Sequence, residues 1–113
     1  MTYKLFIDDE RFPPGGEAGT YDWEIARSSE EAKQMIFRSG MPSFISFDHD
    51  LGGEDTSMVF LKWLIEYILD ANCESTVISK FPDFYVHSQN PIGVKNITGL
   101  IEGFNNSYFG TTR

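Results

Sequence analysis

Residues 44–53 read Phe-Ile-Ser-Phe-Asp-His-Asp-Leu-Gly-Gly, a short apolar run followed by three ionisable residues and a glycine pair. Aromatic and β-branched residues favour strands, so the run Phe44–Phe47 predicts a short β-strand. The pair Gly52-Gly53 predicts a turn soon after it. A strand that ends abruptly in ionisable residues places those residues at one edge of a sheet.

Two other short apolar runs end in the same way. Tyr3–Ile7 stops at Asp8-Asp9, and Phe84–Val86 stops at His87-Ser88. Tyr21–Ala26 alternates enough to predict one more strand. In a parallel sheet the carboxyl ends of the strands meet at one edge, which is where open α/β sheets place their ligand crevices.

Helices are predicted between and after these strands. Ser28 and Glu31 have the spacing of a capping box, which predicts a helix start. Ser57–Leu69 is apolar nearly all round, which predicts a well-buried helix. Asn90-Pro91 is a good start for a third helix. The apolar positions that follow it at helical spacing are Ile97, Leu100, Ile101 and Phe104.

Strands that alternate with helices predict βαβ units and therefore an α/β fold. We expect a single domain over residues 1–113, with a mostly parallel sheet of four to five strands and helices on both faces, three layers in all. The last nine residues are polar and contain a glycine, and they can hold a short extra strand or fray.

The composition is that of one globular domain. Its 113 residues are 41% hydrophobic and 15% aromatic, which is enough for a core. The sequence has no apolar run near the ~18 residues that a membrane helix needs, and its first residues lack the apolar stretch of a signal peptide. A single cysteine, Cys73, excludes an internal disulfide. We expect a cytoplasmic protein.

The charge balance narrows the partners. Nine basic and seventeen acidic residues give a net charge of −8, and they form no basic stripe that could follow a phosphate backbone. Binding to an extended duplex or to a membrane is therefore not expected. A nucleic-acid end or a small nucleotide remains possible, because one phosphate needs only one local site. The sequence leaves the oligomeric state open.

Four aspartates gather at the predicted edge of the sheet: Asp8, Asp9, Asp48 and Asp50. Two unit charges ~4 Å apart repel by about 4 kcal/mol at an effective dielectric of ~20. These carboxylates would repel a phosphate unless something neutralises them. A divalent cation such as Mg²⁺ or Mn²⁺, protonated histidines, or Arg11 could do so.

The two histidines of the chain, His49 and His87, lie at the same predicted edge. Histidine titrates near neutral pH, so both are candidates for the base and acid that open a phosphodiester. Asp48 and Asp50 flank His49 and can orient its ring. Alternation along a strand would send Asp48 and His49 to opposite sides, unless the chain has already turned.

Three further residues are candidates for substrate binding. Arg11 can clamp a phosphate with two hydrogen bonds, or it can pair with a neighbouring carboxylate. Ser88 and Asn90 can donate to phosphate oxygens beside a helix N-terminus, which favours anions. Asn90 can equally be a plain helix cap.

The acidic residues resemble those of response-regulator receiver domains, which have a flavodoxin-like fold. Asp8-Asp9, Asp48 and Ser88 match the receiver pocket, in which the acidic pair and the phosphoacceptor aspartate hold Mg²⁺. The resemblance implies that Asp8, Asp9 and Asp48 bind a divalent metal. Receivers also carry a lysine, usually in a Lys-Pro pair after a fifth strand, and this sequence has no counterpart to it.

The sequence is more similar to a divergent group, the cyclic-phosphate processing receiver domains. The resemblance rests mainly on two motifs, Ser46-Phe47-Asp48-His49-Asp50-Leu51-Gly52 and Val86-His87-Ser88-Gln89-Asn90-Pro91. It also includes the run Leu5–Arg11, Trp23 with Ala26-Arg27, Gly93 and Asn96. It implies a role in processing cyclic phosphates, such as the 2′,3′-cyclic ends that nucleases leave on RNA.

Three functions are compatible with these residues. The first is a phosphoesterase for cyclic phosphates, with His49 and His87 as acid and base. The second is a signalling module with Asp48 as phosphoacceptor, which the missing lysine disfavours. The third is a non-enzymatic module that binds nucleotides. A small, acidic domain of the first kind would suit RNA repair in a phage or mobile element.

Overall fold

The computed structural model describes residues 3–13, 23–73 and 81–109. Its four strands are β1 (Lys4–Ile7), β2 (Trp23–Ala26), β3 (Phe44–Phe47) and β4 (Asp83–Val86). They form one parallel sheet in the order β2-β1-β3-β4. The last residues of the four strands lie side by side in the register, Ile7 beside Ala26 and Phe47, and Phe47 beside Val86. The predicted parallel sheet and its shared carboxyl edge are confirmed.

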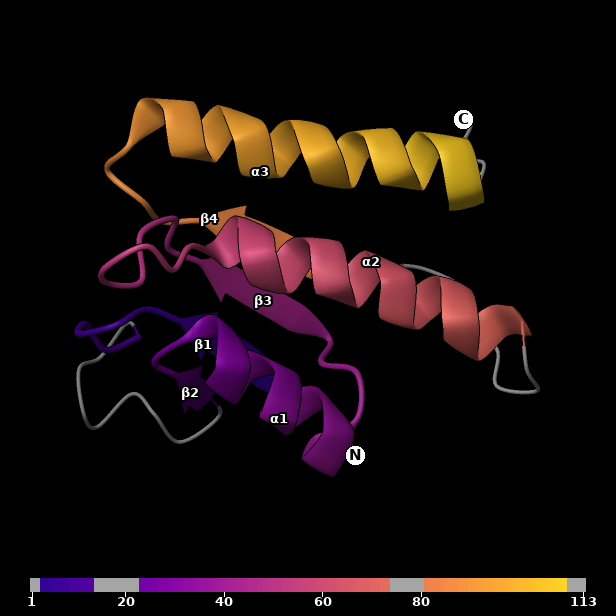
Figure 1. The fold of residues 1–113 in the computed structure, drawn as a ribbon, viewed down its shortest axis with the longest axis horizontal. Helices are drawn as coiled ribbons and strands as arrows, with labels where there is room; N and C mark the ends of the chain where they lie inside the picture. Colours follow the sequence, from indigo (N-terminus) through magenta and orange to yellow (C-terminus); the bar gives the residue numbers. More distant parts are fainter. Residues whose placement is uncertain (1–2, 14–22, 74–80, 110–113) are drawn as a thin grey trace.

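The three helices are α1 (Ser29–Ser39), α2 (Ser57–Cys73) and α3 (Pro91–Phe104), and they lie side by side over one face of the sheet (Figure 1). The connections β2-α1-β3 and β3-α2-β4 run in the same direction across the sheet, so their usual right-handed crossing puts both helices on the same face. We expected helices on both faces of the sheet; within the described residues, all three helices cover the same face. The connection from β1 to β2 runs the other way, and most of it, residues 14–22, lies outside the described part.

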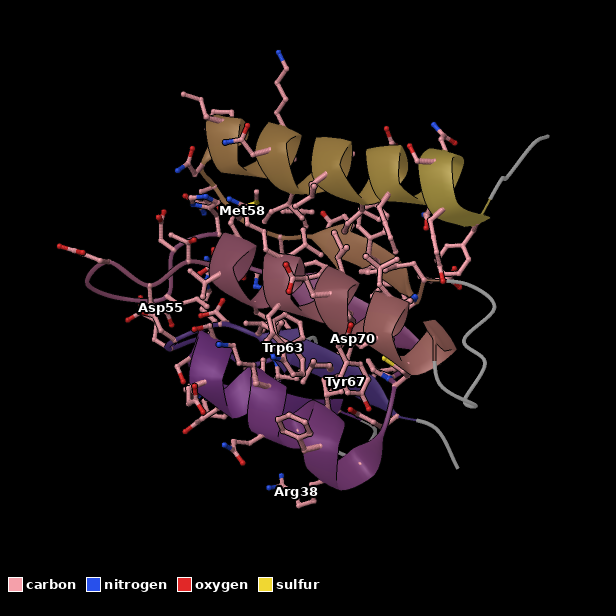
Figure 2. The ribbon with its side chains drawn as sticks, turned by 45° about the vertical axis from the view of Figure 1, so that its right-hand side comes forward. Arg38, Asp55, Met58, Trp63, Tyr67 and Asp70 are labelled. Atoms are coloured by element: carbon pink, nitrogen blue, oxygen red, sulfur yellow. The ribbon has the colours of Figure 1, made fainter. Side chains whose placement is uncertain are left out.

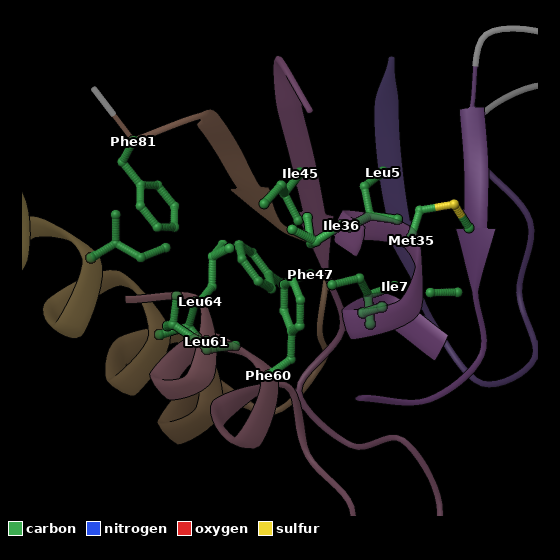
Figure 3. Packing of buried hydrophobic residues seen from close by; sticks show 14 of the residues in the cluster. Leu5, Ile7, Met35, Ile36, Ile45, Phe47, Phe60, Leu61, Leu64 and Phe81 are labelled. Atoms are coloured by element: carbon green, nitrogen blue, oxygen red, sulfur yellow. The ribbon is translucent and has the colours of Figure 1, made fainter. Parts of the chain in front are cut away.

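The core lies between the sheet and these helices (Figure 3). Alternate strand residues point into it, which is why Leu5 and Ile7 belong to the core whereas the buried Phe6 between them does not. The fully buried core residues from the helices are Ala32 and Ile36 of α1, Phe60, Leu61, Leu64 and Ile68 of α2, and Ile97 and Ile101 of α3. Burying each of the Leu, Ile and Phe side chains in this set contributes about 1.5–3 kcal/mol.

Helix α2 is less completely buried than its composition predicts. Val59 and Leu69 are 46% and 37% exposed, so one side of the helix faces solvent. On the side toward α1, Trp63 and Tyr67 stack with ring centroids 5.2 Å apart, and Phe37 of α1 meets Trp63 edge to face at 5.4 Å (Figure 2). Trp63 thus belongs to the packing between helices.

The predicted helix starts are confirmed. The hydroxyl of Ser28 accepts a hydrogen bond from the Glu31 N–H at 3.1 Å. The carboxylate of Glu31 reaches back to the N–H of Arg27, one residue earlier than in a standard capping box. Asn90 caps α3 by accepting from the N–H groups of Ile92 and Gly93.

The C-terminal segment differs from its prediction. Asn105–Phe109 continues α3 as a π-helical turn, so an extra strand in these residues is wrong. Its Phe109 packs on Phe104 and on the core, which favours continued helix over a new strand. Residues 110–113 and the start of the predicted strand at Tyr21 lie outside the described residues. None of the described helices is long and apolar enough to cross a bilayer.

Candidate functional site

Asp8, Asp48 and His87 come together at the carboxyl edge of the sheet. One ligand atom from each lies within 4.8 Å of those of the other two. Their backbone N–H groups extend the sheet ladder by one rung, because Asp8 donates to Ala26, Asp48 to Ile7 and His87 to Phe47. Strand alternation therefore still holds here, and all three side chains share the side of the sheet that carries Phe6 and Ser46.

Asp8 is completely buried, and its carboxylate makes three hydrogen bonds and one ion pair. Its Oδ1 accepts from the backbone N–H groups of Glu10 and Arg11, both at 2.9 Å. Its Oδ2 forms a hydrogen bond with His87 Nε2 at 2.9 Å and an ion pair with Arg11, whose Nε is 3.1 Å away. Burial alone would raise the pKa of Asp8, but the two backbone donors, His87 and Arg11 outweigh it and lower the pKa. Asp8 is thus held as a carboxylate.

His87 is held on both ring nitrogens. Its Nε2 pairs with Asp8, and its Nδ1 lies 2.7 Å from the hydroxyl of Ser46. The imidazole also stacks on the Phe6 ring, with centroids 4.6 Å apart and planes 4° from parallel. Ser46 and Phe6 are therefore site residues that were not predicted. A signal existed for Ser46, since it is the one polar residue of an otherwise apolar strand.

Asp48 and Arg11 form the part of the cluster that borders a pocket. The Arg11 guanidinium lies 3.6 Å from Asp48 Oδ1, so it contacts both carboxylates of the cluster. The Arg11 side chain is 46% exposed, whereas that of Asp48 is 9% exposed. Burial and the charge of Asp8 raise the pKa of Asp48, although Arg11, His87 and the His49 N–H act against them. A carboxyl group with a raised pKa can exchange a proton closer to neutral pH.

Arg27 fixes the loop after β1 from behind. Its guanidinium donates to the backbone carbonyls of Asp8 at 3.1 Å and Arg11 at 2.6 Å. It also lies over the ring of Phe12, 5.0 Å from the centroid. Arg27 is one of the residues on which the family resemblance rests. Its two hydrogen bonds to the loop join residues 16 and 19 positions apart, so they could not be predicted from spacing along the sequence.

His49 lies on the other side of the sheet edge. Its ring packs against α3, where a Cβ on Gly93 would come within 2.7 Å of the His49 Cδ2. Its Nδ1 lies 3.1 Å from the carboxylate of the exposed Asp50. The structure thus does not bring His49 together with His87, because the chain has not yet turned at Asp48 and successive side chains still alternate.

The turn comes in the next residues and is tied to two helices. Buried Ser57, the first residue of α2, donates its hydroxyl to the Asp48 carbonyl and its N–H to the His49 carbonyl. Asp55 accepts from the N–H of Ser29 at 2.8 Å and from its hydroxyl at 2.6 Å, at the start of α1 (Figure 2). These bonds place Asp48 relative to both helices, and nothing in the sequence identifies Asp55 for this role.

A pocket of about 670 Å³ opens in front of this cluster. Its walls are polar and come from the loops after β1, β3 and β4; they are Asp9, Glu10, Arg11, Asp48, Asp50, Gly52, Gly53, Ser88, Gln89 and Asn90. Most of the residues predicted for the site therefore line one pocket. Asp8, His49 and His87 do not line it.

Ser88 and Asn90, in the loop between β4 and α3, use some of their polar atoms for hydrogen bonds to the backbone of the same chain. Ser88 accepts from the Asn90 N–H at 3.0 Å, and the Asn90 side-chain oxygen caps α3. Both readings of Asn90 are compatible with this geometry, since its amide NH₂ is separate from the oxygen that forms the cap.

Comparison with known families identifies the chain. The model of the cyclic-phosphate processing receiver domain matches residues 3–103. The chain belongs to this family. A search of curated proteins and a search of solved structures each return no match.

The metal that receiver domains hold can be tested against this member of the cyclic-phosphate processing family. Asp8, Asp48 and His87 have the right spacing for one ion. However, the two oxygens of Asp8 already make three hydrogen bonds and an ion pair with Arg11, and Arg11 bridges Asp8 and Asp48. A divalent cation does not fit between these carboxylates while the guanidinium is there. Asp9 is exposed at the pocket wall and stands apart from this cluster.

Proposed function

We propose that this domain is a phosphoesterase that opens the ring of a cyclic phosphate in the pocket at the carboxyl edge of its sheet. The proposal depends above all on one observation: a carboxyl group with a raised pKa, Asp48, lies 3.6 Å from a guanidinium that faces the same pocket. Arg11 can bind a phosphate oxygen while Asp48 moves a proton beside it. Membership of a family named for cyclic-phosphate processing supports the same reaction.

The reaction needs one proton acceptor and one proton donor. A water oxygen attacks phosphorus, the bond from phosphorus to one ribose oxygen breaks, and the phosphate becomes a monoester. Asp48 takes the proton from the water and gives a proton to the leaving ribose oxygen, so one group serves both steps. Arg11 stabilises the negative charge that accumulates on the phosphate oxygens in the transition state.

His87 acts in this proposal as a positioning residue. Both of its nitrogens are engaged, by Asp8 and Ser46, and its ring is stacked on Phe6. It holds the Asp8 carboxylate that in turn orients Arg11. His49 has no contact with the cluster through its side chain in the described structure, so it supports the loop and does not transfer a proton to substrate.

The charges of the pocket favour a substrate with one phosphate. Among the described residues that line the pocket, Arg11 is the sole basic one, against the acidic Asp9, Glu10, Asp48 and Asp50. A second phosphate would meet these carboxylates without a cation of its own. A nucleoside 2′,3′-cyclic phosphate, or an RNA end of which only the last nucleotide enters, meets this condition.

Turnover of a nucleoside 2′,3′-cyclic monophosphate, followed by chromatography of the monoester products, tests the proposal. We expect Asp48→Asn to lower kcat at least the ~10²-fold typical of losing a general acid or base. Asp70→Asn makes the same chemical change on an exposed position of α2 and should leave turnover unchanged (Figure 2). No turnover by the wild type on either the mononucleotide or a short RNA with a cyclic end contradicts the proposal, as does full activity of Asp48→Asn.

A receiver-like phosphoacceptor role is the second candidate, because Asp48 directly follows β3 and borders the pocket. Incubation with acetyl phosphate and Mg²⁺ followed by intact-mass measurement separates the two roles. We expect no stable adduct, since this sequence has no counterpart to the lysine that receivers carry. A stoichiometric adduct that disappears in Asp48→Asn, without turnover of cyclic phosphates, would favour the signalling role.

A further inference from the structure

The carboxylates of Asp8 and Asp48 are neutralised by a cationic side chain of the same chain. Two buried carboxylates, Asp8 and Asp48, lie close enough for their oxygens to share one ion. Such a pair is unstable in a low-dielectric setting unless a positive charge accompanies it. Arg11 supplies that charge with Nε at 3.1 Å from Asp8 and a terminal nitrogen at 3.6 Å from Asp48.

We infer that Arg11 is the resident cation of this pocket, in place of a divalent metal, and that the guanidinium and a metal ion exclude each other. The inference concerns what neutralises the carboxylates and does not depend on which reaction the pocket performs. It differs from the expectation that Asp8, Asp9 and Asp48 together bind Mg²⁺ or Mn²⁺. The reason lies in the hydrogen bonds of Asp8.

The backbone makes this arrangement hard to rearrange. The N–H of Arg11 donates to Asp8 Oδ1, and its carbonyl accepts from Arg27, so the main chain of Arg11 is held on both sides. Only its side chain, which is nearly half exposed, can leave the cluster. Even then the two backbone donors keep Asp8 Oδ1 occupied, and Asp8 can offer a metal only Oδ2.

Removing the guanidinium should therefore create a metal site. Without Arg11, the cluster presents one carboxylate oxygen each from Asp8 and Asp48 and one ring nitrogen of His87, all within 4.8 Å of one another. Two carboxylate oxygens and one imidazole suit Mn²⁺, which accepts both ligand types and can keep waters in its other positions. Two negative charges without a counter-ion would then favour uptake of the metal.

Binding of Mn²⁺ in the absence of any nucleotide tests the inference, because the signal of the free hexa-aquo ion in electron paramagnetic resonance is lost on binding. We expect no stoichiometric uptake by the wild type at submillimolar Mn²⁺, and uptake of one ion by Arg11→Ala. Arg38→Ala removes the same charge from the last turn of α1 and should behave as wild type. The double variant Arg11→Ala with Asp48→Asn should lose the site again.

The outcomes are decisive in both directions. Equal uptake by wild type and Arg11→Ala would show that the metal and Arg11 coexist, and absence of uptake by folded Arg11→Ala would show that the carboxylates form no latent site. Either result overturns the inference. If Arg11→Ala is unfolded without metal, circular dichroism replaces the binding signal: refolding on addition of Mn²⁺ supports the inference, and failure to refold contradicts it. None of these results depends on phosphoesterase activity.

Discussion

Gly93 offers a sharp test of how His49 and the loop after β3 are placed. This glycine is in the first turn of α3 and is buried. A Cβ built there would come within 2.6 Å of the His49 Cβ and 2.7 Å of its Cδ2, distances at which something must move. The contacted atoms belong to the root and ring of His49, so the strain passes to a loop that Ser57 holds by two hydrogen bonds.

The expected magnitude follows from two opposing effects. Overpacking a well-filled site costs typically ~1–3 kcal/mol. Alanine gains up to ~1 kcal/mol over glycine inside a helix, less in its first turn. Gly93→Ala should thus destabilise the fold by ~1–2 kcal/mol. Gly99 and Gly103 are exposed positions of the same helix, where an added Cβ meets nothing within 4 Å. Alanine at either should stabilise by ~0.5–1 kcal/mol.

Thermal unfolding measured by circular dichroism distinguishes these cases. At about 4 °C per kcal/mol for a domain of this size, Gly93→Ala should melt roughly 6–12 °C below Gly99→Ala. The double variant Gly93→Ala with His49→Ala should recover part of the loss, because the clashing ring is gone. A Gly93→Ala protein as stable as Gly99→Ala would refute the packing of His49 against α3, and with it the separation of the two histidines.

Four further predictions concern charged groups and hydrogen bonds around the site. Because the pKa of Asp48 is raised in the fold, the stability linked to its protonated form is lost as the pH rises through that pKa. Asp48→Asn should therefore have a higher melting temperature than wild type at pH 7. In a series of melts at different pH, this difference should shrink toward pH 4. Because the pKa of Asp8 is lowered in the fold, its carboxylate stabilises the protein above the pKa of aspartate in the unfolded chain, and this stability is lost as the pH falls through the lowered pKa. The melting temperature of Asp8→Asn should therefore fall less at acid pH than that of wild type. Ser46→Ala removes one partner of His87 and should cost about 1 kcal/mol in urea unfolding, whereas Ser43→Ala at the edge of the same strand should cost less. Asp55→Ala removes two hydrogen bonds from the start of α1 and should cost ~1–2 kcal/mol, whereas Glu54→Ala next to it should be nearly neutral.

The fold was predictable from local signals. Three apolar runs end in ionisable residues, and helix starts at Ser28 and Asn90 have side chains that cap them. These signals involve only a few neighbouring residues, so they can be recognised in the sequence without knowledge of the tertiary structure. The exposed side of α2 was not predictable in the same way. Its composition is apolar nearly all round, and only the positions of α1 and α3 decide which apolar residues remain in solvent.

The candidate site was predictable as a set of residues and not as a set of contacts. Parallel strands of equal length bring their ends to one edge, which places Asp8, Asp48 and His87 together. Whether His49 joins them depends on a single residue of register. Because the ladder continues through Asp48, the side chain of His49 turns to the helical face. Sequence spacing alone could not tell when the chain leaves the sheet.

The neutralisation of the carboxylates depends on pairings that local sequence does not determine. Arg11 could have paired with the adjacent Glu10 as easily as with an aspartate. Asp8 decides the outcome, because its Oδ1 captures the N–H groups of both residues and bends the loop so that the Arg11 side chain returns over the sheet edge. Arg27 then holds the bent loop by its carbonyls. A buried carboxylate thus builds the turn that brings its own counter-ion, and the same counter-ion reaches the pocket where a phosphate would bind.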